Sequence, residues 1–148
     1  MSTYTQILYQ IVFSTRNRKK CLCKNDREEL FMYIHGILKN KNCHVYLING
    51  VKDHLHIVTH IHPAISLASL IKDIKLATTE YIHYEFLFPG FDGWQDGYGA
   101  FTYSINAKNN LIEYVKNQED HHRLKTFKDE YIALLNEHEI KYEEKYLL

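Results

Sequence analysis

The sequence has few of the residues that interrupt or divide a fold. Its 148 residues include only two prolines, Pro63 and Pro89, and six glycines, so no Pro/Gly-rich linker is present. Low-complexity segments and internal repeats are also absent. A chain of this length can bury a hydrophobic core without disulfide bonds. We therefore expect a single domain over residues 1–148.

Long apolar runs are missing as well. No stretch of about eighteen apolar residues occurs, which excludes a transmembrane helix. The first ten residues lack a charged segment followed by an apolar core, so they do not read as a secretory signal. We expect a cytoplasmic protein with no membrane partner. Cys21, Cys23 and Cys43 form no CxxC pair, and in a reducing compartment we expect three free thiols.

The chain has no net charge, because 18 basic residues balance 18 acidic ones. Binding that coats nucleic acid non-specifically scales with the phosphates neutralised, so this balance argues against that class of protein. The one basic run, RNRKK at residues 16–20, directly follows an apolar segment. A loop at that point could present the run to phosphate groups, or it could simply be solvated.

Apolar periodicity and caps predict a mixed fold. We expect strands at residues 4–14, 43–49, 54–61 and 98–105. We expect helices at 27–41, 67–83, 107–120 and 127–137, and the N-caps of the first three are Asp26, Ser66 and Asn106. The order of these elements predicts an α+β, ferredoxin-like (split βαβ) fold. Two helices would cover one face of an antiparallel sheet, followed by C-terminal helices. That fold hosts unrelated functions, so it names none.

The sequence His54-Leu55-His56 lies in the third predicted strand. Residues i and i+2 of a strand point to the same face, so both imidazoles would project together and could bind a divalent metal ion. The alternative is that these are simply two polar residues on a solvent-exposed face of the sheet. His60 and His62 follow closely, and His60 would share that face in an ideal strand.

A second pair, Tyr114 and Gln118, is spaced by one helical turn, so a phenol and a carboxamide oxygen could face the same point. Taken alone, the pair is equally compatible with an amphipathic helix carrying a solvated Gln. Combined with two nitrogen ligands, however, it supplies the parts for metal-assisted transesterification of a phosphodiester. The metal would stabilise charge on the phosphate, and tyrosine would be the nucleophile.

With these residues in view, the chain resembles the single-tyrosine HUH transposases of small bacterial insertion sequences, including the REP-associated tyrosine transposases. The pattern HUH denotes His, a bulky hydrophobe and His. The resemblance spans nearly the whole chain in the expected order. It rests on YQIVFSTRNRKK (9–20), VKDHLHIV (51–58), GWQDGYGAFTYS (93–104), IEYVKNQEDHH (112–122) and the segment 125–148.

The resemblance implies DNA transposase activity on single-stranded, hairpin-bearing element ends. Tyr114 would attack a phosphate to form a 5′-phosphotyrosine link, and the reverse attack would rejoin strands. His54, His56 and Gln118 would bind Mg²⁺ or Mn²⁺. The protein would be a homodimer, with the tyrosine helix serving either its own histidines or those of the partner. The expected DNA contacts are Arg16, Arg18, Lys19, Lys20, His121 and His122.

Two further points stay open at the level of sequence. The 12 tyrosines could stack bases, which would favour a non-catalytic single-stranded nucleic-acid-binding module on the same fold. Trp94 could position DNA, although packing of the loop before the fourth strand is the favoured role. Gly97 and Gly99 are expected to serve the backbone rather than a ligand.

Overall fold

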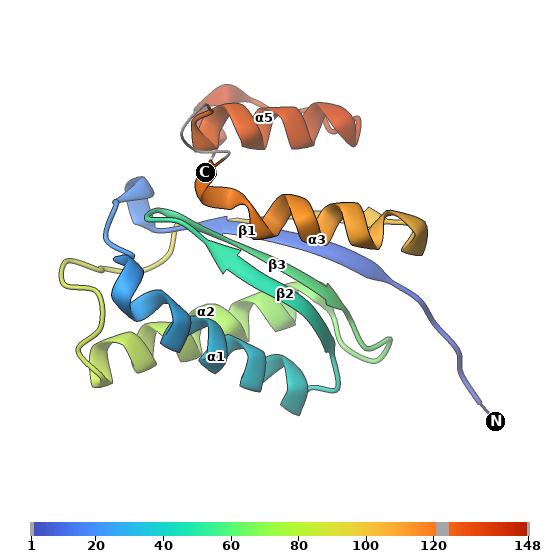
Figure 1. The fold of residues 1–148 in the computed structure, drawn as a ribbon, viewed down its shortest axis with the longest axis horizontal. Coiled ribbons are helices and arrows are strands. Elements are labelled where there is room, and N and C mark those ends of the chain that lie inside the picture. The colour runs from blue at the N-terminus through green and yellow to red at the C-terminus, as the bar shows by residue number, and fades with distance from the viewer. Residues whose placement is uncertain (1, 121–124, 148) are drawn as a thin grey trace.

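A computed structural model describes residues 2–120 and 125–147 of the chain. The sheet strands are β1 (Leu8–Ser14), β2 (His44–Gly50), β3 (His54–His60) and β4 (Gly99–Tyr103). The α-helices are α1 (Lys24–Asn40), α2 (Leu67–Tyr84), α3 (Lys108–Lys116) and α5 (Phe127–Glu137), with short 3-10 turns at Arg16–Arg18, Ile105–Ala107 and Glu144–Tyr146. Figure 1 shows α1 and α2 on one side of the sheet, and α3 and α5 on the other.

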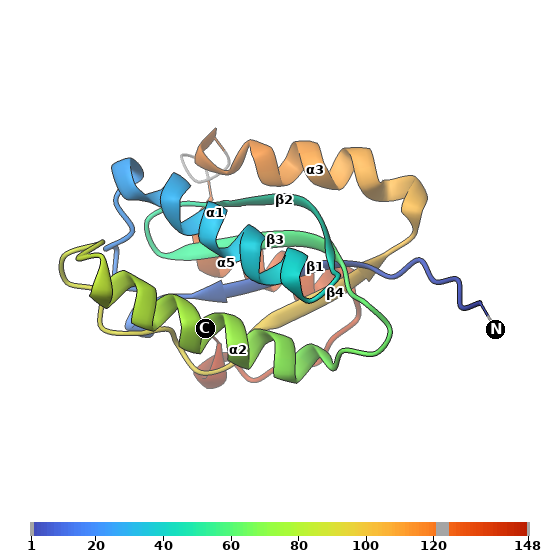
Figure 2. The ribbon, with the colours of Figure 1, turned by 90° about the horizontal axis from the view of Figure 1, so that it is seen from below.

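The four strands lie in the order β2-β3-β1-β4, and every neighbouring pair is antiparallel. This order confirms the split βαβ arrangement expected from the sequence. It places β1 and β3 at the centre of the sheet, so the HxH strand has a hydrogen-bonded neighbour on each side. In Figure 2, seen from below, α1 and α2 lie in front of these strands.

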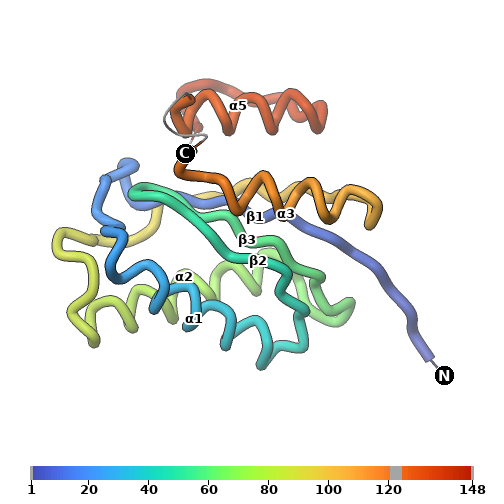
Figure 3. Tube along the Cα trace, in the orientation of Figure 1, coloured from blue at the N-terminus to red at the C-terminus, as the bar shows by residue number. Residues whose placement is uncertain are grey.

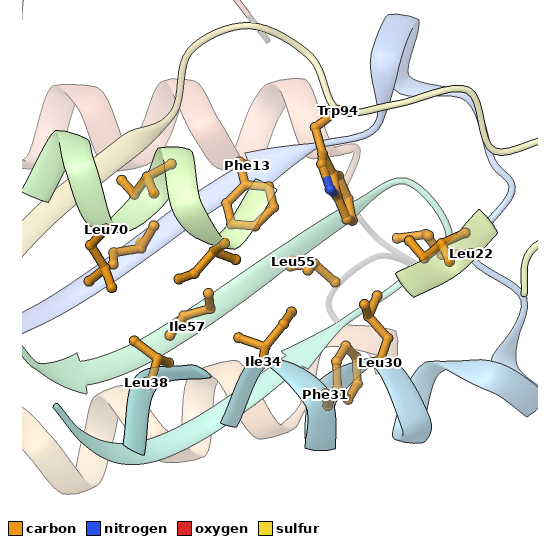
Figure 4. Packing of buried hydrophobic residues seen from close by; sticks show 14 of the residues in the cluster. Phe13, Leu22, Leu30, Phe31, Ile34, Leu38, Leu55, Ile57, Leu70 and Trp94 are labelled. Carbon is orange, nitrogen blue, oxygen red and sulfur yellow. The ribbon is translucent and has the colours of Figure 1, made fainter. Parts of the chain in front are cut away.

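Alternate side chains of each strand pack on opposite faces of the sheet. Ile11, Phe13, Leu55 and Ile57 pack against α1 and α2 in the larger apolar cluster. Figure 4 shows Phe13 and Leu55 in this cluster, beside Trp94. The intervening residues of the same strands face α3 and α5, where two smaller apolar clusters form. The histidines of β3 therefore lie on the side of the sheet covered by the C-terminal helices.

Of the three predicted N-caps only Ser66 is confirmed, and the start of the first strand needs correction. Ser66 caps α2 by accepting a hydrogen bond from the Ser69 N–H at 3.0 Å. The first strand begins at Leu8 rather than at residue 4, because both of its partner strands reach only that far. The N-terminal segment before Leu8 runs away from the sheet in Figure 3.

The first helix begins earlier than expected, at Lys24, so Asp26 lies in its first turn and does not cap it. The reason is tertiary, because the buried Leu22 donates its N–H to the Lys52 carbonyl at 2.9 Å and fixes the start of the helix. A carboxylate in the first turn still stabilises the positive end of the helix dipole. Cys21, Cys23 and Cys43 are free thiols, as expected.

The predicted helix at 107–120 is broken. A 3-10 turn precedes α3, so Asn106 is not its cap, and α3 ends at Lys116. Asn49 of β2 donates its side-chain amide to the carbonyls of Val115 (2.9 Å) and Lys116 (3.1 Å), which satisfies the last turn. Residues 118–120 are helical again after this break.

The loop before β4 is held in the larger core. Trp94 is 5% exposed, packs edge-on against Phe13 at 5.0 Å, and donates its indole N–H to Thr78 at 2.9 Å. This confirms the packing role expected for Trp94. Gly97 has a φ of +88°, which a side chain would strain, so its role is also one of backbone geometry. No helix among the described residues is both long and apolar enough to span a bilayer.

Gly99→Ala is expected to destabilise the fold, because a Cβ at this position would lie 2.7 Å from the Tyr131 ring of α5. Overpacking of this kind costs about 1–3 kcal/mol of unfolding free energy. Gly36→Ala is the matched control, since a Cβ there meets nothing within 4 Å and removal of a helical glycine should stabilise α1 by up to about 1 kcal/mol. Urea denaturation of both variants measures the difference. Equal stability of the two variants would contradict the close packing of α5 on β4.

Candidate metal and nucleophile site

His54 and His56 project side by side from β3 and have no exposed surface. Each ring is oriented through Nδ1, which donates to Asp53 Oδ1 for His54 and to Gln10 Oε1 for His56, both at 2.7 Å. Nδ1 and Nε2 lie on opposite sides of an imidazole ring. Nε2 of each histidine therefore faces α5. Outer partners of this type fix the tautomer and orientation of metal-binding histidines.

The carboxylate of Glu130, from α5, completes the cluster on that side. Its Oε1 lies 3.0 Å from Nε2 of His56 and 3.4 Å from Nε2 of His54. Glu130 is 2% exposed. One ligand atom from each of the three residues lies within 4.8 Å of the others, so this buried group could hold a metal ion.

The second oxygen of the same carboxylate faces the tyrosine helix. The Tyr114 hydroxyl donates to Oε2 of Glu130 at 2.5 Å, and the Gln118 amide donates to the same oxygen at 3.2 Å. Tyr114 and Gln118 thus meet at one point, although the break at Asn117 separates their helical segments. Glu130 therefore lies between the histidine pair and the phenol, within a single chain.

Burial and charge act on both ends of this cluster. Desolvation lowers the pKa of His54, but the hydrogen bonds and charges of Asp53 and Glu130 outweigh it and raise that pKa above its ordinary value. Burial, with the Glu130 carboxylate second, raises the pKa of the Tyr114 phenol. In this arrangement the phenol keeps its proton and donates it in the hydrogen bond to Glu130.

The start of α5 covers the histidine pair. The Phe127 ring stacks on His54, with centroids 4.0 Å apart and planes 17° apart. It stacks on Tyr131 as well, at 5.6 Å, within the smaller core under α5. The cluster is therefore closed by the same helix that supplies Glu130.

The donor set fits a divalent transition metal. Two imidazole nitrogens and one carboxylate oxygen on one side of a site form a facial arrangement that leaves positions open for a substrate. The cluster is buried, and the Nδ1 protons of both rings are already donated elsewhere. Nε2 of each ring and Oε1 of Glu130 then converge on one point, where either a proton or a metal cation is favoured.

The comparisons with known proteins decide the family. The family of IS200-like transposases matches residues 3–118, more than three quarters of the chain. The chain belongs to this family. Membership makes it a DNA transposase and confirms the resemblance drawn from the sequence. A search of curated proteins gave no match.

Two solved structures resemble this IS200-like transposase. One is a candidate transposase from Deinococcus radiodurans R1, with a TM-score of 0.63 and 18% identity over 80% of this chain and 95% of that chain. The other is a REP-associated tyrosine transposase bound to a REP hairpin, with a TM-score of 0.61 and 15% identity over 82% of this chain and 74% of that chain. At such low identity the likeness establishes the shared fold.

The structure brings some of the predicted site residues together and separates others. His54, His56, Tyr114 and Gln118 meet around Glu130. His60 does not join them, because its ring accepts the Ile7 N–H at 2.9 Å at the other end of the strand. The predicted DNA contacts at positions 16, 18, 19 and 20 form an exposed segment after β1. His121 and His122 lie outside the described residues.

Glu130 was missed by the sequence reasoning. It lies beyond the stretch that matches the family, in the predicted helix at 127–137. The signal was available, because Phe127, Tyr131 and Leu134 form an apolar stripe and Glu130 lies within it. A carboxylate on the buried face of a helix is costly unless it has a partner. Nothing in the helix pattern said which partner it would meet.

Proposed function

We propose that this transposase cleaves and rejoins single-stranded DNA with Tyr114 as the nucleophile and His54 and His56 as metal ligands. The observation that carries the proposal is the convergence of the phenol and both imidazoles on the carboxylate of Glu130. Gln118 is a further candidate ligand through its side-chain oxygen, as the family resemblance predicts. Glu130 is a further proposed ligand, which the sequence did not predict.

In the proposed reaction the Tyr114 oxygen bonds to phosphorus and the bond from phosphorus to the 3′ oxygen breaks. The phosphate stays on the 5′ end of the downstream strand as a phosphotyrosine. The released 3′ oxygen of the upstream strand takes up a proton. Glu130 Oε2, at 2.5 Å from the phenol, is positioned to accept the tyrosine proton. Attack by a 3′-hydroxyl reverses each step, so strand joining needs no external energy source.

The metal would polarise the scissile phosphate and stabilise the charge on its oxygens. Mg²⁺ prefers all-oxygen, octahedral sites, whereas imidazole nitrogen is better suited to transition metals. Two histidines with one carboxylate therefore favour Mn²⁺ over Mg²⁺. His54 and His56 have no exposed surface, whereas Tyr114 is half-buried and lines a pocket together with Glu130.

The DNA substrate is proposed to be a single strand with a hairpin. Of the basic residues that the sequence predicts as DNA contacts, Arg18 and Lys20 are the proposed backbone contacts, because their side chains line a cleft beside the histidine pair. The cluster is complete within one chain, so the chemistry does not require the homodimer that the resemblance predicts, and that homodimer stays a prediction. A binding module that stacks bases on its sheet has less support, since helices cover both faces of this sheet.

The test is to incubate the protein with single-stranded DNA hairpins and Mn²⁺, and to look for a covalent adduct on a denaturing gel. We expect an adduct that maps to the peptide containing Tyr114 and that disappears when EDTA replaces the metal. Hairpins drawn from the DNA flanking the gene are the first substrates to try. The absence of an adduct with all of them, or an adduct on another residue, would contradict the mechanism.

Glu130→Gln is expected to weaken Mn²⁺ binding by at least the about 10–100-fold that loss of an outer partner costs, and to slow cleavage, because a neutral amide is a weaker ligand than a carboxylate and a poor proton acceptor. Glu137→Gln, on the same helix but exposed, is the matched control and should change neither quantity. Titration calorimetry gives the affinity and the adduct assay gives the rate. Faster cleavage by Glu130→Gln would mean that this carboxylate only blocks the site.

A further inference from the structure

A cleft of about 780 Å³ opens beside the histidine pair. Its walls come from five parts of the chain: the segment after β1, the start of α1, the β2–β3 connection, the helical residues 118–120 and the start of α5. Two of its lining residues, Asp53 and Phe127, contact His54 directly. A third, Glu119, is the neighbour of Gln118. The cleft therefore runs along the outer edge of the proposed active site.

Positive charge gathers in this cleft. Five cationic side chains line it against two carboxylates, in a chain whose net charge is zero. The cationic residues are Arg18, Lys20, Arg27, Lys52 and Lys128. A cleft lined by one sign of charge focuses its field and attracts an oppositely charged polymer.

The carboxylates of the cleft are already engaged. Asp53 accepts from His54 at 2.7 Å, and Glu119 pairs with Arg27 at 3.1 Å. Lys52, by contrast, is exposed and forms no ion pair with any described residue. Lys128 pairs with Glu144 at 3.0 Å. The wall formed by the first residues of α5 adds the positive end of a helix dipole.

The fold divides the basic run at residues 16–20 between two directions. Arg18 and Lys20 line the cleft. Arg16 instead lies against Gly93, and Lys19 against Gly90, so both follow the loop before β4. Asn17 and Arg18 have φ values of +56° and +52°, and this left-handed turn accounts for the alternation of directions.

We infer that this cleft binds the sugar–phosphate backbone of single-stranded DNA next to the cleaved bond, with Arg18, Lys20, Lys52 and Lys128 as the phosphate contacts. The inference rests on the proposed function for the identity of the polymer. It extends that function by adding Lys52 and Lys128, and it removes Arg16 and Lys19 from the DNA contacts that the sequence predicts. Long flexible cations on exposed walls suit a backbone that is held by charge rather than by base sequence.

The test measures binding of a fluorescein-labelled oligodeoxythymidylate by anisotropy, in EDTA, over a range of salt concentrations. Loss of two single-strand phosphate contacts, each contributing about 0.7 to the slope of log K against log salt, predicts about 25-fold weaker binding at about 0.1 M salt. The affinities should converge near about 1 M salt. We expect this result for K52Q/K128Q and, separately, for R18Q/K20Q.

Two double variants serve as controls with the same change of charge. R16Q/K19Q alters the other half of the basic run, and K39Q/K72Q alters exposed residues of α1 and α2 on the far side of the sheet. Both should bind within about twofold of the unmodified protein. Equal weakening by either control pair, or unchanged binding by both cleft pairs, would overturn the inference.

The outcome can be separated from that of the proposed function. If the unmodified protein forms the Tyr114 adduct but both cleft pairs bind DNA normally, the chemistry stands and the cleft assignment fails. If the cleft pairs lose binding as expected and no adduct forms on any substrate, the binding surface stands and the proposed chemistry fails. Circular dichroism melts test whether each of these variants is folded.

Discussion

Tyr114→Phe is expected to abolish the covalent protein–DNA adduct while leaving the affinity for single-stranded DNA unchanged. The ring and its packing are kept, but the oxygen that would bond to phosphorus is lost. The loss should be complete within detection, since no other described tyrosine donates to Glu130. Gel analysis of the adduct, with anisotropy on the same DNA, measures both quantities.

The matched control is Tyr46→Phe. Tyr46 is half-buried, packs in the cluster under α3, and lies under the Lys108 ammonium rather than at the histidine pair. It should form the adduct at a rate within about twofold of the unmodified protein. Tyr114→Phe also loses a hydrogen bond to a carboxylate, which costs about 1.5–3 kcal/mol. Thermal melts are therefore needed, and an adduct that persists in a folded Tyr114→Phe variant would exclude Tyr114 as nucleophile.

His56→Ala is expected to remove metal-dependent cleavage. If the metal contributes about 4 kcal/mol of transition-state stabilisation, its loss slows cleavage about 10³-fold. His54→Ala should act in the same way, because both Nε2 atoms face the same carboxylate oxygen. Mn²⁺ binding by calorimetry and single-turnover cleavage should fall together.

The same strand offers a matched control in His60→Ala. This histidine lies four residues after His56 and so on the same alternation of β3, but it bonds to the backbone of Ile7 and lies away from Glu130. Its loss should leave cleavage and Mn²⁺ affinity within about twofold. Cleavage by His56→Ala that resists EDTA, or an equal loss in His60→Ala, would show that the histidine pair is not the metal site.

Much of the fold could be predicted because local rules decide it. The strand alternation around His54 and His56, the Ser66 cap and the span of α5 depend on neighbouring residues only. The boundaries that were wrong depend on distant contacts. Leu22 starts α1 by bonding across to the β2–β3 connection, and Asn49 ends α3 from another strand.

The features of the site also fall into those set by local sequence and those set by tertiary contacts. By itself, the sequence determined that two imidazoles share one face of a strand, because that follows from the two-residue repeat of the backbone. It also supplied Tyr114 and Gln118 through the family resemblance. Only the tertiary structure decided that the Glu130 carboxylate lies between them, that a break separates the Tyr114 and Gln118 segments, and that Arg18 and Arg16 face different ways. These features depend on how α5 packs across the sheet and on one left-handed turn, and neither leaves a periodic pattern in the sequence.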